Sequence, residues 1–575
     1  MTPHAYLPPA LERGRTWGFA LNLYALRSQR NWGVGDFTDL REAVRILRGF
    51  DAGVIGINPL HALHYLAPDA ASPYSPTSRY FLNPLYIDVE AVEEFEAAGE
   101  RADALRRRIS SEVFRETLAG LRATRTVEYA RVARAKWSAF EELYAIFSAR
   151  KGERRRAFEA FVQRGGIRLE RFALYEALNE RFAGDAGRVR GWMTWPQEYR
   201  DPASPAVAAF AARYRRRVRY YQYLQWLADG QLAQAAAQAQ GAAIGLYRDL
   251  AVGVDRGGAD VWSEPDAYVL EESVGAPPDP FGPLGQNWGF PPADPERLLR
   301  DGGTSFRELL RANMIHAGAL RIDHVMGLMR LYRIPSGKPA SEGAYVSYPF
   351  EELLRMLLSE SVGARCVVVG EDLGTVPEGF RERMGRAAIL SHPLLLFERD
   401  FDGRFRAPHE YPALALATAT THDLPTLGGW AIGRDIDVRE ELGLLRPADA
   451  VEARSLRRID LSHLLEALRA YAALGEADFH SLHATVDAKV AEGECYEPLV
   501  RAAYRFLAET PSRVVLIQLD DALGELDQVN LPGTFVEYTN WRRKTSFDLE
   551  GIAADPRVAA IAGEVRERIR RGNQR

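Results

Sequence analysis

The sequence has few cysteines and no long apolar segment. Only Cys366 and Cys495 occur among 575 residues, so no disulfide framework is predicted and a reducing compartment is favoured. No apolar run reaches the roughly 18 residues that a membrane-spanning helix needs. The first residues also lack the apolar core of a signal peptide. We therefore expect a cytoplasmic protein that does not enter a membrane.

Neither sign of charge is in excess. The chain has 73 basic and 78 acidic residues, which gives a formal net charge of −5. A protein whose main partner is nucleic acid usually carries a strongly basic surface, so we predict no nucleic-acid partner. Hydrophobic residues make up 47% and charged residues 26% of the chain, as is usual for a globular protein. Its 59 aromatic residues (10 Trp, 24 Tyr and 25 Phe) supply flat faces for core packing or for stacking on sugars.

Short apolar segments recur along the chain and are typical of buried parallel strands. Eight of them lie at residues 17–24, 53–58, 243–250, 317–323, 366–370, 393–397, 413–420 and 513–518. Between them, apolar residues recur every three or four positions, which indicates helices. This alternation predicts an α/β fold, a (β/α)8 TIM barrel, in a single domain over residues 1–575. The spacing alone leaves a doubly wound open sheet as an alternative.

Two helical stretches are too long for a simple barrel unit. Residues 85–240 are almost wholly helical in pattern and follow the second predicted strand. A smaller helical stretch, residues 436–505, follows the seventh. We predict that both are helical insertions into the barrel.

The stretch 275–292 has six prolines and four glycines in 18 residues. Such a composition excludes a helix, and a long irregular loop in a compact domain is usually a lid or a binding loop. A plain connection is the alternative. The aromatic residues Phe281, Trp288 and Phe290 favour a loop that covers a ligand, so we predict an active-site loop here.

Three acidic residues stand just past predicted strands. Asp323 and Arg321 are two residues apart, so on a strand they face the same way and the guanidinium favours an ionised carboxylate. Glu371 follows a run of three valines and Gly370, and such an apolar setting suits a proton donor. Asp423 follows His422 in a Thr- and Pro-containing turn. Taken singly, each motif also fits a strand-end ion pair, a helix cap or a polar turn.

Together the three acids point to the chemistry of glycosidic bonds. The carboxyl ends of parallel strands lie on one face of a barrel, which is where such folds keep their active sites. Paired carboxylates break acetals, one as nucleophile and the other as proton donor. A nucleophile kept charged by Arg321 and a separate acid, Glu371, predict the retaining route through a glycosyl-enzyme ester.

The ordered motifs RIDH (321–324), GEDLG (370–374) and TTHDLP (420–425) resemble those of the 4-α-glucanotransferases. These enzymes, also called amylomaltases or disproportionating enzymes, belong to the α-amylase clan. The resemblance extends over residues 17–542 and is strongest to the bacterial maltose-utilisation branch. Further matching segments are 24–40, 57–63, 72–88, 245–262, 285–289 and 530–541.

The resemblance implies an activity and a set of site residues. Asp323 would be the nucleophile, Glu371 the acid/base, and Asp423 the stabiliser of the transition state. The residues implied to bind substrate are Ser72, Tyr74, Asp249, Gln286, Trp288, Arg321, His324, His422 and Asn530. The implied reaction transfers a segment of an α-1,4-glucan to the 4-hydroxyl of glucose or a maltooligosaccharide, with no metal or cofactor.

Two rival functions remain at this stage. A hydrolase of the same clan would share the three acids and release only shorter sugars. A non-catalytic glucan-binding barrel would lack at least one of the acids, and all three are present here.

Overall fold

Seven parallel strands form the central sheet. The computed structural model describes residues 4–183, 191–278, 284–300, 302–485 and 496–574. The strand order is β11-β8-β5-β2-β1-β13-β12, and every neighbouring pair is parallel. The strands are β1 (Thr16–Leu21), β2 (Val54–Ile57), β5 (Gly245–Leu250), β8 (Ala319–Ile322), β11 (Val367–Gly370), β12 (Leu416–Thr418) and β13 (Val514–Gln518).

Residues 390–394 occupy the eighth position of the barrel. They join β11 to β12 through isolated parallel bridges, from Leu390 to Val369, from Ser391 to Ala415 and from Leu394 to Thr418. The predicted strand 393–397 is therefore wrong in its bounds, because residues Leu395–Phe397 form a 3-10 helix, η8. Pro393 has no N–H to donate, which prevents a continuous ladder here. The prediction of a (β/α)8 barrel is confirmed.

Side chains from alternate strand positions fill the barrel interior. One buried cluster brings together Val54, Tyr247, Ala319, Val367, Val369, Leu390, Leu416, Val514 and Leu516. Residues two positions further along a strand face the same side. The interior therefore continues towards the carboxyl ends of the strands with Asp249, Arg321, Glu371 and His392.

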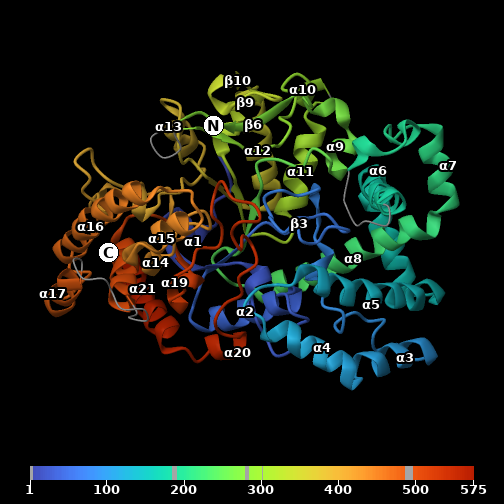
Figure 1. Ribbon diagram of the computed structural model, residues 1–575, viewed down its shortest axis with the longest axis horizontal. Coiled ribbons are helices and arrows are strands. Elements are labelled where there is room, and N and C mark those ends of the chain that lie inside the picture. The colour runs from blue at the N-terminus through green and yellow to red at the C-terminus, as the bar shows by residue number, and fades with distance from the viewer. Residues whose placement is uncertain (1–3, 184–190, 279–283, 301, 486–495, 575) are drawn as a thin grey trace.

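Helices occupy the long connection between β2 and β5 (Figure 1). They are α3 (Glu100–Ile109), α4 (Glu112–Ala123), α5 (Tyr129–Ala149), α6 (Glu153–Phe182), α7 (Pro205–Arg213) and α8 (Arg215–Gln238). Residues 184–190 of the stretch 85–240 lie outside the described residues. That this stretch is a subdomain with those limits stays a prediction.

A second group of helices follows β12 and lies on the opposite side of the barrel from α3–α8 (Figure 1). These are α14 (Leu427–Ile432), α15 (Arg434–Glu441), α16 (Pro447–Ala470), α17 (Glu476–Thr485) and α18 (Glu497–Glu509). The stretch 436–505 includes residues 486–495, which are also outside the described part of the chain.

The remaining helices complete the outer layer of the molecule. They are α1 (Pro9–Glu12), α2 (Phe37–Gly49), α9 (Ala259–Ser263), α10 (Arg297–Arg300), α11 (Thr304–Met314), α12 (Phe350–Ala364), α13 (Phe380–Arg386), α19 (Leu519–Leu523), α20 (Leu549–Ile552) and α21 (Pro556–Gln574). In the part of the chain that the structure describes, none of the helices combines the length and apolar character needed to span a bilayer.

A small antiparallel sheet carries the predicted active-site loop. Its strands are β6 (Glu272–Ala276), β7 (Gln286–Asn287), β9 (Arg330–Pro335) and β10 (Ala344–Ser347), in the order β10-β9-β6-β7. The stretch 275–292 is thus partly strand, since Gly275 pairs with Asn287. Phe281 lies among residues 279–283, outside the described residues. A separate hairpin pairs β3 (His61–Ala62) with β4 (Ser78–Leu82).

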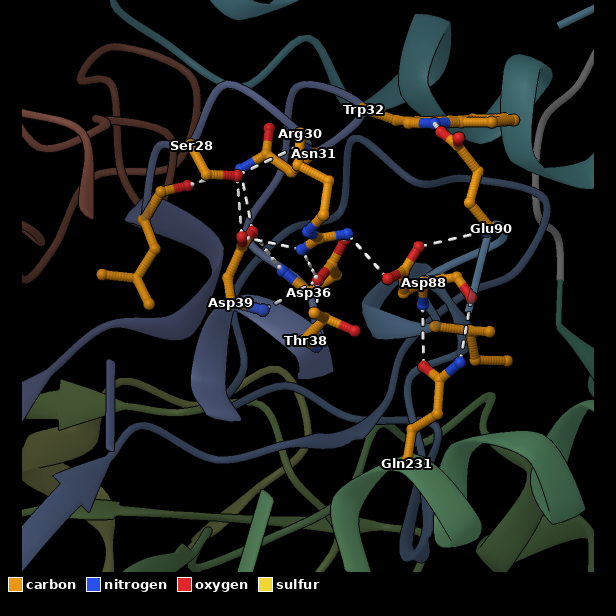
Figure 2. A network of polar contacts seen from close by, with 12 residues as sticks. Ser28, Arg30, Asn31, Trp32, Asp36, Thr38, Asp39, Asp88, Glu90 and Gln231 are labelled. Atoms are coloured by element: carbon orange, nitrogen blue, oxygen red, sulfur yellow. Dashed lines mark hydrogen bonds and ion pairs between the residues drawn. The ribbon is translucent and has the colours of Figure 1, made fainter. Parts of the chain in front are cut away.

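A buried ionic network fixes the first barrel loop to the start of the long helical connection (Figure 2). Asp36 caps α2 in a reciprocal capping box with Asp39. Arg30 binds Asp36 and Asp39 at 2.5 and 2.8 Å, and Asp88 at 2.7 Å. The side chain of Gln231 in α8 bonds both the N–H and the carbonyl of Asp88. Arg30 therefore joins the two carboxylates at the start of α2 to Asp88, which follows β4 in the chain.

Candidate active site

The acids that the sequence singles out meet at the carboxyl end of the barrel. Asp249 is the residue before the last in β5, Asp323 follows β8, and Glu371 follows β11. Asp423 lies five residues past the end of β12. Each strand delivers its acid to the same face, because all the strands of the barrel are parallel.

Arg321 connects two of these carboxylates. Its Nη2 lies 2.8 Å from Oδ1 of Asp323, and its Nη1 lies 2.8 and 2.9 Å from the two oxygens of Asp249. Burial alone would lower the pKa of Arg321, but the charges of Asp249 and Asp323 raise it well above its usual value. Arg321 therefore stays charged and stabilises negative charge on Asp323.

Glu371 lies in a drier and more negative setting. Burial, together with the nearby charge of Asp323, raises its pKa to about 7 against the opposing effect of Arg321. Its carboxylate accepts the N–H of His324 at 2.8 Å and the N–H of Leu373 at 2.6 Å. These two hydrogen bonds hold the side chain in place, but they bring no charged group next to it. A carboxyl group poised near neutral pH is suited to proton transfer.

Asp423 is held by two neighbours at the rim of the site. The amide of Asn530 donates to its Oδ1 at 2.6 Å, and Nε2 of His422 lies 3.3 Å from its Oδ2. Desolvation by the surrounding protein would raise its pKa, but His422 and Asn530 outweigh it and lower the pKa to about 2. The carboxylate stays ionised while half of its side chain is exposed, so it can accept hydroxyl groups of a ligand.

An aromatic wall stands beside these acids. The ring of Tyr74 stacks on His422 with centroids 4.4 Å apart, and both rings lie within 5.4 Å of the ring of Trp541. The hydroxyl of Tyr74 donates to Asp249 at 2.5 Å. The sequence singled out Tyr74 and His422 but not Trp541. Its place in the matched segment 530–541 was the only available signal.

The described part of the predicted active-site loop reaches the same place. The ring of Trp288 meets the ring of His324 edge to face at 5.4 Å, and its Nε1 donates to Oε1 of Gln286 at 2.9 Å. His324 adopts the left-handed conformation, with φ 49°, directly after Asp323. Burial lowers the pKa of His324, which favours a neutral ring. The loop and the strand-end residues thus share one site.

Ser72 is the predicted site residue with the weakest link to this group. Its carbonyl accepts the N–H of Ser75 in the turn that carries Tyr74. Within the described residues, no side-chain hydrogen bond from Ser72 to the acids is present.

Two residues that the sequence did not single out, Tyr247 and His392, line a cavity next to Arg321. The place of Tyr247 in the matched segment 245–262 is the signal that could have marked it, whereas His392 sits in an apolar strand-like run that hides it.

Comparison with known proteins gives a consistent result. The family model described as 4-alpha-glucanotransferase matches residues 21–549. A 4-alpha-glucanotransferase of Haemophilus influenzae is 37% identical over 557 residues, which cover 95% of this chain and 78% of the relative. One from Mycobacterium tuberculosis is 37% identical over 579 residues, or 97% of this chain and 76% of the relative.

Solved structures agree with the sequence matches. Amylomaltase from Corynebacterium glutamicum superposes with a TM-score of 0.85 at 32% identity, over 97% of this chain and 77% of that one. Amylomaltase from Streptococcus agalactiae, solved in complex with acarbose, has a TM-score of 0.74 at 19% identity and shares the fold, over 96% and 99% of the two chains. With a barrel of this form, three acids at its carboxyl end and these matches, the chain belongs to the 4-alpha-glucanotransferase family, the enzymes that move segments of α-1,4-glucan from one chain to another.

Proposed function

We propose that Asp323 is the nucleophile of this transferase, Glu371 its acid/base and Asp423 the stabiliser of the transition state. The observation that carries the proposal is the opposite setting of the two central acids. Arg321 lies 2.8 Å from Asp323 and stabilises its negative charge, whereas burial raises the pKa of Glu371 to about 7. A carboxylate paired with a cation, next to a carboxyl group whose pKa is raised, matches the needs of a retaining glycosidase.

The first half of the reaction forms an ester. An oxygen of Asp323 attacks C1 of the glucose unit at the cleavage point, and Glu371 gives its proton to the glycosidic oxygen. The reducing-end part of the glucan leaves with a new 4-hydroxyl. Asp423, ionised beside His422 and Asn530, accepts hydroxyl groups of the same glucose unit and so helps to distort and hold it.

The second half reverses these steps with a new chain. The 4-hydroxyl of glucose or a maltooligosaccharide attacks C1, and the Glu371 carboxylate takes the hydroxyl proton. The bond from C1 to Asp323 breaks and the carboxylate is restored. Two inversions at C1 leave an α-1,4-linkage. Ser72, Tyr74, Asp249, Gln286, Trp288, Arg321, His324, His422 and Asn530 are the proposed glucan contacts.

The composition and the pattern of the sequence support proposals on the cellular location, the ligand class and the domain limits of the enzyme. We propose a cytoplasmic enzyme, since two cysteines in 575 residues suit a reducing compartment. The near balance of basic and acidic residues supports glucans rather than nucleic acid as its ligands. We also propose one catalytic barrel with helical subdomains at 85–240 and 436–505 and an active-site loop at 275–292.

Incubation with maltotriose tests the transfer reaction. We expect glucose and a ladder of longer maltooligosaccharides, whereas a hydrolase gives only shorter sugars. With α-maltosyl fluoride as donor, the product should keep the α configuration when followed by NMR. Products of β configuration would contradict the retaining route.

Substitution of the nucleophile tests the residue roles. Asp323→Asn keeps the size of the side chain but removes the charge, and we expect kcat to fall by about 1,000-fold or more. Asp402→Asn, on an exposed loop, serves as a control and should change kcat by less than about twofold. Full activity of the Asp323 variant would refute the assignment.

A further inference from the structure

A cavity of about 80 Å³ lies in the mouth of the barrel beside Arg321. Protein interiors are usually close-packed, so a space that exceeds the volume of one water molecule calls for a cause. Here the cause is small residues: Ala20 of β1 and Gly56 of β2 both line it. A Cβ atom on Gly56 would lie 2.9 Å from the ring of Tyr247. The sequence therefore keeps this part of the barrel open.

Two buried polar side chains line this cavity without any partner. His392 is 4% exposed, and neither of its ring nitrogens has a hydrogen bond; Tyr247 is 5% exposed, and its hydroxyl also has none. Buried polar atoms in native proteins are nearly always paired, with protein, ligand or water. Three unpaired atoms around one cavity indicate that it holds a polar occupant.

The position of His392 is fixed by the barrel itself. The segment 390–394 takes the eighth strand position, and Leu390 packs into the barrel interior. His392 is two residues further on and faces the same side. Its backbone N–H donates to Oδ1 of Asp372 at 3.1 Å, and Asp372 in turn binds Arg381 at 2.7 Å. The backbone of His392 is therefore held in place, which fixes the point from which the imidazole projects.

The charges around the cavity restrict what can bind there. Burial, with the charges of Arg321 and His422, lowers the pKa of His392 to about 3, so its ring is neutral. A neutral imidazole offers one donor and one acceptor, and the Tyr247 hydroxyl offers both. Arg321 disfavours a cation. The carboxylates of Asp249 and Asp521, which also line the cavity, disfavour an anion. A neutral hydroxyl group, which both donates and accepts, fits best.

We propose that His392 and Tyr247 form a hydroxyl-binding site beside Arg321. Its ligand is a hydroxyl of the glucosyl unit bound to Asp323, or a water molecule that stays behind that unit. The sugar form of this proposal rests on the proposed function, because only a nucleophilic Asp323 brings the glucosyl unit next to Arg321. In either form His392 is a positioning or specificity-determining residue that lies outside the motifs of the three acids.

Three variants test the site by kinetics. His392→Phe removes both nitrogens and keeps a flat ring, His392→Gln keeps one donor and one acceptor, and Tyr247→Phe removes one oxygen. With α-maltosyl fluoride as donor and maltose as acceptor, we expect kcat/KM to fall about 10- to 100-fold for His392→Phe. His392→Gln should recover most of that loss, and Tyr247→Phe should show a smaller loss. His463→Phe, in α16, is the control and should stay within about twofold of wild type.

Deoxygenated donors separate the two sources of the hydroxyl. α-Maltosyl fluorides lacking the 2-, 3- or 6-hydroxyl of the fluorinated glucose are compared in wild type and His392→Phe. If the sugar supplies the group, one analogue is slow with wild type but no slower than the parent donor with His392→Phe. If water supplies it, His392→Phe slows the parent donor and every analogue by the same factor. Both results support a hydroxyl site.

Thermal unfolding without substrate gives an independent reading. If water occupies the site, we expect a lower melting temperature for His392→Phe than for wild type, because the bound water loses its partner. Wild-type kcat/KM together with a raised melting temperature would overturn the proposal, since it would mean that the nitrogens had no ligand to lose. If His392→Phe does not fold, Tyr247→Phe decides: no change in kcat/KM or melting temperature overturns the site. A wild-type enzyme that forms no ladder from maltotriose would refute the proposed function, and the unfolding comparison would still test the cavity.

Discussion

At the scale of single residues, the three catalytic acids have different electrostatic neighbours. Arg321 binds Asp323 and Asp249 at 2.8 Å, so positive charge lies next to both. Glu371 instead receives two backbone amides and is otherwise desolvated, which raises its pKa to about 7. Asp423 lies at the other extreme with a pKa of about 2. The roles proposed for the acids follow from these neighbours rather than from the acids themselves.

The pKa of Glu371 sets a pH dependence for the first half of the reaction. The group must be protonated to act as an acid, and its pKa is raised to about 7 in the folded protein. We expect kcat/KM for maltotriose to be flat below that pH and to fall tenfold per unit above it. A donor with a fluoride leaving group needs no proton, so the same fall should be absent for α-maltosyl fluoride. A fall at the same pH with both donors would contradict the assignment.

The sequence predicted the three acids and the contact of Arg321 with Asp323, because strand ends and a two-residue spacing are local signals. It could not show that Arg321 also binds Asp249, since those residues are 72 positions apart and meet only through the pairing of β5 with β8. His392 was not foreseen for a related reason. Its importance depends on a cavity that Ala20 and Gly56 leave open on the other side of the barrel.

At the scale of elements, the strand β7 and the residues after it bring an indole to the catalytic face. Trp288 contacts His324, the residue next to Asp323, and bonds Gln286 through its Nε1. A side chain in this place can exclude water and can offer an acceptor sugar a flat surface. Both effects favour transfer over hydrolysis.

Replacing Trp288 tests this role of the loop. We expect Trp288→Ala to raise the ratio of hydrolysis to transfer by about 2- to 13-fold, since one lost stacking contact corresponds to roughly 0.5–1.5 kcal/mol. The ratio is measured by free glucose against longer oligosaccharides from maltotriose. Leu284→Ala is a matched control, because Leu284 is in the same loop but 87% exposed. An unchanged ratio in the Trp288 variant would show that the loop does not control water.

The elements themselves were predicted unevenly. Seven barrel strands were found near their observed positions because each is a short, mostly apolar run. The eighth was placed too late, since the apolar residues after Pro393 suggested a strand where a 3-10 helix forms. The small antiparallel sheet was missed because β6 pairs with β9, about 60 residues further along. Pairing between distant, short strands leaves little periodic signal in either one.

At the scale of the whole molecule, stability depends on joints between the barrel and its long connections. The network in Figure 2 is one such joint, in which Arg30 binds Asp36, Asp39 and Asp88. Burial and the charges of Asp39 and Asp88 raise the pKa of Asp36, so the carboxylates depend on Arg30 for compensation. The length of the helical stretches was visible in the sequence, but this joint was not.

Removing Arg30 should loosen that joint. We expect Arg30→Met to lower the free energy of unfolding by about 3 kcal/mol, the low end for a buried ion pair, because 34% of the Arg30 side chain is exposed. Burial raises the folded-state pKa values of Asp36 and Asp39, and the loss of Arg30 removes a charge that opposes this shift. The loss should therefore be largest at pH 8 and shrink towards pH 5, where the acids bind protons.

Urea unfolding at several pH values measures this effect. Arg45→Met is the control, since Arg45 is on the exposed side of α2 and pairs with Glu42 of the same helix; we expect no measurable change in the free energy of unfolding. A loss for Arg30→Met that does not depend on pH would mean that packing of its stem, rather than its charge, holds the joint.

The eighth position of the barrel gives the molecule a weak seam. Residues 390–394 touch their neighbours through isolated bridges, whereas β1 makes continuous ladders on both sides. Fluctuations that open the barrel should therefore begin between β11 and β12, next to Glu371 and His392. In hydrogen exchange, the amides of 390–394 should lose protection before those of β1 and β13. The barrel would then lose its catalytic geometry well before it loses its fold, so heat should inactivate the enzyme below its unfolding temperature.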